Sequence, residues 1–141
     1  MTDFKKLCLD TAPLIYFLEE ESSENARVRQ IFLSLSEQIE QVVLSTITCM
    51  EYLVLPYRMK DEKAIQSFWA FVQDAEVDVR PVDMKIALKA AEIRAEYKFK
   101  AMDSLQLATA CMSGCDLFLT NDKQLKQFKE ISCVTVEEWR F

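Results

Sequence analysis

The chain has 141 residues, half of them hydrophobic, and a formal net charge of −6, so we expect one folded domain spanning residues 1–141. It contains no histidine and a single glycine, Gly114. These two facts exclude Ser-His-Asp and Cys-His catalysis, and they exclude a glycine-rich P-loop or dinucleotide-binding turn.

Neither a membrane span nor a secretion signal is expected, which makes a cytoplasmic protein the default. No apolar run approaches the ~20 residues that cross a bilayer, and Asp10 interrupts the short apolar stretch near the N-terminus. The five cysteines form no C-x-x-C pair. Without histidine a zinc site would need four of them, so buried free thiols are the preferred interpretation.

Short β-type runs alternate with longer helical patterns along the chain. In chain order, we predict a strand at 6–10, helices at 12–20 and 25–40, a strand at 41–45, helices at 48–59 and 62–74, a strand at 77–81, helices at 84–98 and 102–113, a strand at 117–120, a helix at 122–128 and a strand at 133–136. Most of these strands are continuous apolar runs, typical of strands covered on both faces. The alternation predicts a three-layer α/β domain, in which helices flank a central, mostly parallel sheet of about five strands.

Four acidic residues fall at the ends of predicted strands or near the start of a helix. Asp10 ends the first strand, and Asp122 follows the fourth. Glu51 lies one helical turn after the second strand, and Asp103 opens a strongly apolar helix. Because ligands of an open parallel sheet bind beyond the carboxyl ends of its strands, these four acids can converge on one edge of the sheet.

Each acid also has a simpler structural explanation as a helix cap. Thr48-x-x-Glu51 fits a capping box, and the other three stand at predicted helix starts. Asp83 also precedes a helix, and we interpret it as a cap. Four acids gathered at one edge would repel one another without a cation, a cost that separate caps would avoid, so together they favour a metal site.

The segments around the four acids resemble those of PIN-domain ribonucleases, and specifically the VapC-type toxins of bacterial toxin–antitoxin pairs. The likeness runs from Leu9 to about Trp139. Its four segments, in the family's order, are residues 9–16 (LDTAPLIY), 45–51 (STITCME), 102–110 (MDSLQLATA) and 119–122 (LTND). Glycine, common in such toxins before the third acid and after the second, is missing around Tyr97–Ala101 and around Tyr57, which bears on loop geometry and RNA preference.

The resemblance implies a PIN-like fold and an endoribonuclease that hydrolyses RNA phosphodiester bonds with Mg²⁺ or Mn²⁺. Asp10 and Asp103 would be the principal metal ligands. Glu51 and Asp122 would complete the catalytic site directly or through water. Hard cations of this kind prefer carboxylate oxygen, and the sequence offers no softer set of ligands.

Three polar neighbours of the acids are candidates for a supporting role. The hydroxyls of Thr11 and Thr120 would orient carboxylates, although ordinary turn and cap chemistry explains them about as well. Asn121 would contact RNA or the surroundings of the metal. Lysines near the site would contact phosphates, with a solvated helix face as the preferred alternative; they are Lys98, Lys100, Lys123 and Lys126.

The resemblance also implies partners: an RNA substrate, a small antitoxin protein and, as often in the family, a second copy of the chain; no membrane partner is expected. A groove for an antitoxin peptide would use Tyr16 or Phe17 with one or two rings from residues 68–71. The charge of −6 predicts weak non-specific affinity for RNA.

Two other functions remain open. A phosphatase of the haloacid dehalogenase type also begins with a strand ending in aspartate, but it needs a second acid two residues later, where this chain has Ala12. The second alternative is a catalytically silent PIN-like protein that binds RNA or acts as a scaffold. The presence of all four acids argues against it.

Overall fold

The computed structural model describes residues 3–19 and 23–141, and its centre is a sheet of five strands that all run parallel. The strands are β1 (Lys6–Leu9), β2 (Gln41–Ser45), β3 (Asp78–Arg80), β4 (Leu117–Thr120) and β5 (Ser132–Thr135), in the spatial order β3-β2-β1-β4-β5. The helices are α1 (Thr11–Leu18), α2 (Ser23–Leu35), α3 (Thr46–Arg58), α4 (Glu62–Asp74), α5 (Met84–Tyr97) and α6 (Ala101–Met112), and a 3₁₀ helix, η1, spans Lys123–Gln127. The predicted α/β class is confirmed.

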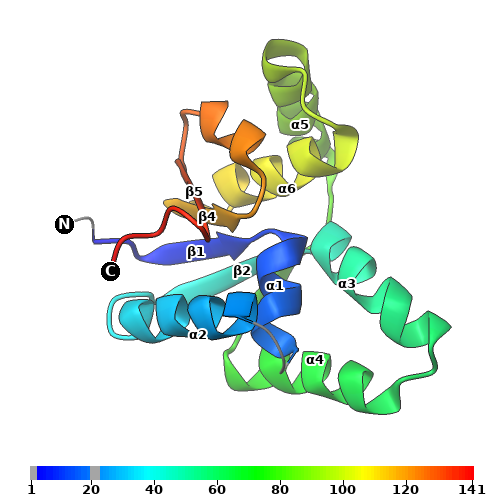
Figure 1. The fold of residues 1–141 in the computed structure, drawn as a ribbon. Helices are drawn as coiled ribbons and strands as arrows, with labels where there is room; N and C mark the ends of the chain where they lie inside the picture. Colours follow the sequence, from blue (N-terminus) through cyan, green and yellow to red (C-terminus); the bar gives the residue numbers. More distant parts are fainter. Residues whose placement is uncertain (1–2, 20–22) are drawn as a thin grey trace.

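Helices cover both faces of the sheet, so the prediction of three layers is also confirmed. Alternate residues of a strand point to opposite faces. In β1, Cys8 packs with the core under α5 and α6, whereas Leu7 and Leu9 pack with the core under α1 to α4. Figure 1 shows α5 and α6 on one side of the sheet and α1, α2 and α4 on the other.

The central strand β1 pairs with β2 on one side and with β4 on the other. The chain adds β2 and β3 on the first side and then crosses over to add β4 and β5 on the second. Leu9 lies opposite Leu119, and the N–H of Asp10 donates to the carbonyl of Leu119 at 2.9 Å. Because neighbouring strands are parallel, the segments that leave β1, β2 and β4 all begin at one edge of the sheet.

Most boundaries agree with the predictions, and the differences have local causes. The helix expected to reach residue 40 ends at Leu35, because the chain turns there and the N–H of Glu40 donates to the carbonyl of Lys5 at 2.7 Å. The helix expected at 122–128 is the shorter η1. The predicted end of the first helix, Glu20, lies outside the described residues. No helix in the described ranges is long and apolar enough to span a membrane.

Three residues other than glycine adopt left-handed backbone conformations: Lys60 (φ 54°), Glu76 (φ 48°) and Lys98 (φ 60°). Two of these, Lys60 and Lys98, lie in or near the segments where the toxins that the sequence resembles commonly carry glycine. Lys98 ends α5, and its N–H donates to the carbonyl of Arg94 at 3.0 Å, the usual arrangement of a left-handed helix cap. The chain thus forms a glycine-type helix end with a lysine, which costs free energy because Cβ crowds the backbone.

Lys98→Gly should therefore stabilise the protein. Relief of the left-handed strain outweighs the extra freedom of glycine in the unfolded chain, so the free energy of unfolding should rise by about 0.5–1 kcal/mol. Urea denaturation of the two proteins measures this difference. Lys85→Gly, an exposed site inside the same helix, is the control and should lower stability by about 1 kcal/mol. Equal losses in both variants would contradict the prediction.

Candidate active site

Asp10 stands at the end of β1 with both carboxylate oxygens engaged. Its Oδ1 accepts a hydrogen bond from the N–H of Thr11 at 2.7 Å, so Asp10 is the N-cap of α1. Its Oδ2 accepts one from Thr120 Oγ1 at 2.6 Å, and Thr120 is fully buried at the end of β4. The hydroxyl of Thr120 also accepts from the N–H of Asp122 at 3.0 Å. Thr120 therefore ties the Asp10 carboxylate to the turn that carries Asp122.

Glu51 lies inside α3 and reaches across to the start of α1. Its Oε1 accepts from Thr11 Oγ1 at 2.8 Å and lies 3.2 Å from Gln106 Nε2. The capping box considered for Glu51 is wrong, because α3 begins at Thr46 and its N-cap is Ser45. The Oγ of Ser45 accepts a hydrogen bond from the N–H of Ile47 at 3.1 Å. Glu51 is thus free of capping and bonded to another element.

The capping explanation also fails for Asp103, but it holds for Asp122 and for the control residue Asp83, as it does for Asp10. Asp103 is the third residue of α6, whose N-cap is Lys100, a residue that makes no side-chain cap bond. Asp122 caps η1 through a 2.9 Å hydrogen bond from the N–H of Gln124. Asp83 caps α5 through a 2.9 Å hydrogen bond from a backbone N–H, as we expected for this control residue.

The charges of the four acids act on one another. Burial, followed by the negative charges of Asp10, Asp122 and Glu51, raises the pKa of Asp103 to about 6, and Lys100 partly offsets this. Burial also raises the pKa of Asp10 above its ordinary value, with smaller contributions in the same direction from Glu51 and Asp122. Hydrogen bonds from Thr120 and Thr11 oppose that shift. The fold therefore holds the four acids near enough to disfavour full ionisation together.

The acids are not assembled as a ready-made metal cage. Within the described residues, no three His, Cys, Asp or Glu side chains form a group that could hold a metal ion. The donor chemistry nevertheless suits a hard cation, because every acid supplies carboxylate oxygen and a cation would offset both the burial and the negative charges that raise the pKa of Asp103. The roles of the four acids as ligands stay predictions.

Two hydroxyl groups predicted to orient carboxylates do contact them: Thr120 bonds Asp10 and Thr11 bonds Glu51. The sequence interpretation missed Gln106, whose side chain is 1% exposed and points its amide nitrogen at Thr11, Thr48 and Glu51. The sequence did offer one signal, because Gln106 is a polar residue between the apolar residues Leu105 and Leu107 of α6.

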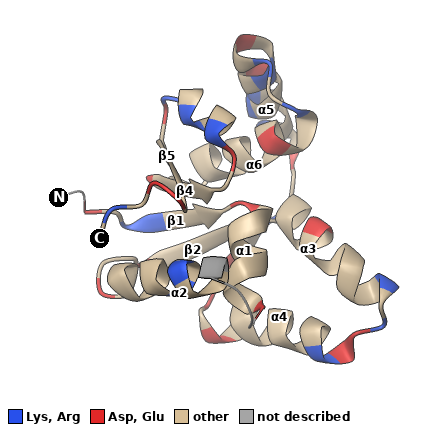
Figure 2. Cartoon of the chain, viewed as in Figure 1, with Lys and Arg blue, Asp and Glu red and all other residues tan. Residues whose placement is uncertain are grey.

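The lysines near the site differ in their surroundings. Lys123 pairs with Glu137 at 3.5 Å, and Lys126 pairs with Glu138, so the charges of both are partly neutralised. Lys100 is exposed beside Asp103. Figure 2 shows basic residues spread over several elements rather than gathered on one of them. Weak non-specific affinity for RNA stays a prediction. Asn121 is exposed after β4, and its role stays a prediction.

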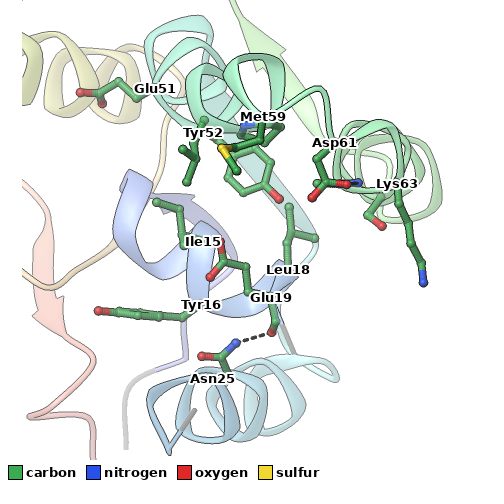
Figure 3. Close-up of a pocket in the computed structure, with 14 residues that line it drawn as sticks. Ile15, Tyr16, Leu18, Glu19, Asn25, Glu51, Tyr52, Met59, Asp61 and Lys63 are labelled. Carbon is green, nitrogen blue, oxygen red and sulfur yellow. Dashed lines mark hydrogen bonds between the residues drawn. The ribbon is translucent and has the colours of Figure 1, made fainter. Parts of the chain in front are cut away.

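Glu51 also lines a pocket of about 810 Å³ between α1 and the α3–α4 pair. Tyr16, Tyr52, Leu55 and Met59 supply much of its apolar wall. In Figure 3 the side chain of Glu51 lies apart from the other labelled side chains, at the edge of the pocket. The pocket therefore opens beside one of the four acids.

Comparison with known proteins identifies the family. The PIN domain model matches residues 7–131, and the chain therefore belongs to the PIN domain family, a family of nucleases. This confirms the resemblance seen in the sequence. The comparison with curated proteins finds no match.

Solved structures with the same fold include several toxin–antitoxin proteins. A chain of VapBC2 from Rickettsia felis, bound to a promoter DNA fragment, has a TM-score of 0.74 and 15% identity, covering 92% of this chain and 98% of that one. A toxin–antitoxin complex from Klebsiella pneumoniae gives a TM-score of 0.70 and 25% identity, covering 94% and 99%. VapC20 from Mycobacterium tuberculosis, described as a sarcin–ricin loop cleaving toxin, gives 0.67 and 16%, covering 89% and 98%.

The raised pKa of Asp103 predicts that the metal-free protein gains stability as the pH falls from 7 toward 5. Between the ordinary value of 3.8 and about 6, the folded chain binds a proton at Asp103 that the unfolded chain does not, so unfolding becomes less favourable as the pH falls through this window. Asp103→Asn should remove this part of the pH dependence and raise the melting temperature at pH 7. Melting curves in EDTA at several pH values measure both effects.

Asp83→Asn is the matched control, because it changes a capping aspartate outside the four acids and asparagine caps about as well. It should leave the pH dependence as in the wild type. An Asp103→Asn variant with the same pH dependence and a lower melting temperature would show that Asp103 has no charge coupling to the other acids.

Proposed function

We propose that this protein is a Mg²⁺- or Mn²⁺-dependent endoribonuclease that hydrolyses RNA phosphodiester bonds with Asp10, Glu51, Asp103 and Asp122. The observation that carries the proposal is the placing of these acids at one edge of a PIN-domain sheet, where burial and then the negative charges of Asp10, Asp122 and Glu51 raise the pKa of Asp103 to about 6. Acids that repel one another in the metal-free fold are expected at a cation site, whereas separate helix caps would avoid that cost.

The chain's own groups prepare the carboxylates for this role. Thr120 and the N–H of Thr11 hold the two oxygens of Asp10, so its direction is set before any ligand arrives. Asp103 and Asp10 would bind the cation directly, and Glu51 and Asp122 would complete its surroundings directly or through water. Such a cation, when bound, lowers the pKa of water and stabilises charge on a phosphate oxygen.

The silent RNA-binding or scaffold protein remains the alternative. Nothing in the geometry favours it over the enzyme, because all four acids are retained and two of them lie outside any capping role. A nuclease assay with and without chelator separates the two functions.

We also infer that the protein is the toxin of a toxin–antitoxin pair that acts on RNA in the cytoplasm. Support comes from the fold it shares with chains of the Rickettsia felis and Klebsiella pneumoniae complexes and with the toxin VapC20. The partner would be a small antitoxin protein, and the pocket beside Glu51 would receive one of its segments. Tyr16 lines that pocket, whereas Phe17 packs against Phe32 and Phe71 outside it, and none of residues 68–71 lines it. The contact of Tyr16 with an antitoxin stays a prediction.

Purified protein should cut RNA in the presence of Mg²⁺ or Mn²⁺ and stop in excess EDTA. Asp10→Asn and Asp103→Asn should each lower the cleavage rate by several orders of magnitude, because each removes a negative charge that would face the cation directly. A gel assay of RNA cleavage at equal protein concentration measures these rates. Asp83→Asn should cleave at nearly the wild-type rate. Cleavage undiminished by EDTA would refute the metal dependence, and equal rates for the Asp10 and Asp83 variants would refute the site.

Expression of the wild-type chain alone should arrest growth of a bacterial host, and expression of Asp10→Asn should not. Co-expression of a small protein encoded by the neighbouring reading frame should restore growth, since an antitoxin would block the site. Growth curves after induction test both statements. Harmless accumulation of active wild-type enzyme would argue for a nuclease with a narrow substrate instead of a toxin.

A further inference from the structure

We propose that Gln106 is a positioning residue of the site, which fixes the Glu51 carboxylate and joins the helices that carry the acids. The inference rests on the proposed function and deepens it. Gln106 lies on α6 one turn after Asp103, so the two side chains share a side of that helix. Its role would be exerted through Glu51, without contact to RNA.

The amide of Gln106 lies at the meeting point of three elements. Its Nε2 is 2.9 Å from Thr48 Oγ1 on α3, 3.1 Å from Thr11 Oγ1 on α1 and 3.2 Å from Glu51 Oε1 on α3. Thr48 is fully buried and Gln106 is nearly so. The two N–H groups of one amide thus serve three oxygen atoms, and the contacts bring α1, α3 and α6 together at the height of the acids.

The chemistry of the neighbours determines how the amide faces. An ionised carboxylate only accepts hydrogen bonds, so the amide nitrogen of Gln106 and not its oxygen must point at Glu51. Thr11 donates its single hydroxyl proton to Glu51 Oε1 at 2.8 Å and therefore accepts from Gln106. Gln106, Thr11 and Glu51 close a triangle in which none of the three side chains can rotate without breaking a bond.

This arrangement differs from that of the other buried polar side chains on the same helix. Ser104 Oγ donates to the carbonyl of Lys100 at 2.9 Å, and Thr109 Oγ1 donates to the carbonyl of Leu105 at 2.8 Å. Both bond only their own helix or its cap, as expected of hydroxyl groups placed inside a helix. Gln106 bonds to two other helices, and both carry or adjoin one of the acids.

A fixed carboxylate matters because an unrestrained glutamate loses rotamer freedom when it binds a ligand. Holding Glu51 Oε1 in advance removes part of that cost, and partners of this kind typically affect metal affinity or activity by about 10–100-fold. A long apolar residue at position 106 would fill the space but leave the charged Oε1 with one donor fewer. The position therefore demands a donor of this length.

The test compares Gln106→Met with Thr109→Val in the full chain. Mn²⁺ affinity is measured by titration of the protein with the metal alone, and kcat and KM are measured separately for RNA cleavage. Gln106→Met should weaken Mn²⁺ binding by about 10–100-fold and lower kcat, with KM for RNA nearly unchanged. Thr109→Val also removes a buried hydroxyl, yet it should leave Mn²⁺ affinity and kcat at wild-type values.

Two further variants keep the proposal testable if Gln106→Met folds poorly. Thr48→Val removes one acceptor that holds the amide and should weaken Mn²⁺ binding a few-fold. Thr11→Val removes the hydroxyl shared by Gln106 and Glu51, and its effect on Mn²⁺ affinity should be non-additive with that of Gln106→Met, because both act on one oxygen. Circular dichroism confirms that each variant is folded.

The outcomes separate the two proposals. Wild-type protein that neither binds Mn²⁺ nor cuts RNA overturns the proposed function, and the role of Gln106 with it. Active wild-type protein, with a folded Gln106→Met variant whose Mn²⁺ affinity and kcat stay within twofold of it, overturns the role of Gln106 alone. With a Gln106→Met variant too unstable to titrate, a Thr48→Val variant of wild-type Mn²⁺ affinity overturns it as well.

Discussion

The parallel pairing of β1 with β4 is the constraint from which the arrangement of the acids follows. It sets Leu9 opposite Leu119, so that Asp10 and Thr120 leave the sheet at the same height and the Thr120 hydroxyl meets the Asp10 carboxylate at 2.6 Å. A shift of one residue between the two strands would turn Thr120 to the other face of the sheet. Such a shift would also move Leu117 and Leu119 out of the core under α1 to α4 and move Phe118 out of the core under α5 and α6, so the packing on both faces opposes it.

The acids lower the stability of the fold in which they lie. Asp10 and Asp103 are partly buried and face further negative charges, and both effects raise the pKa of each carboxyl group. The surrounding structure supplies compensating hydrogen bonds at Asp10, from Thr120 and Thr11, and at Glu51, from Thr11 and Gln106. Unfavourable local energies of this kind concentrate at functional sites, where a bound ligand can offset them.

The sequence allowed the fold to be predicted closely, because its strands are short apolar runs with clear polar limits. The limits of β2, α4 and β4 match the prediction. The four acids were expected at one edge of the sheet, and in the structure the charges of Asp10, Asp122 and Glu51 act on Asp103. The end of α2 was misplaced because no glycine or proline marks it. The helix ends at Leu35 because the chain turns there, and the turn lets the N–H of Glu40 donate to the carbonyl of Lys5.

The support around the acids could be predicted only in part: Thr11 and Thr120 were expected to orient carboxylates, but the particular contacts they make, and the contacts of Gln106, were not. The bond between Thr11 and Glu51 joins residues 40 positions apart, and Gln106 meets Thr48 across 58 positions. Such contacts depend on how α6 crosses α1 and α3, which no local pattern of residue types encodes. Local rules also favoured Glu51 and Asp103 as helix caps. In the structure Ser45 caps α3, and no side chain caps α6.

The pocket between α1 and the α3–α4 pair shares Glu51 with the acidic site. Binding in the pocket and binding at the acids would therefore be thermodynamically linked. In the proposed metal site, a molecule that fills the pocket and turns Glu51 away from Thr11 would change the affinity of the acids for a cation. Reciprocity then requires that the cation change the affinity of that molecule by the same factor. Occupancy of the pocket would thus vary with the divalent cation concentration around the protein, even if the molecule that occupies it never touches the metal.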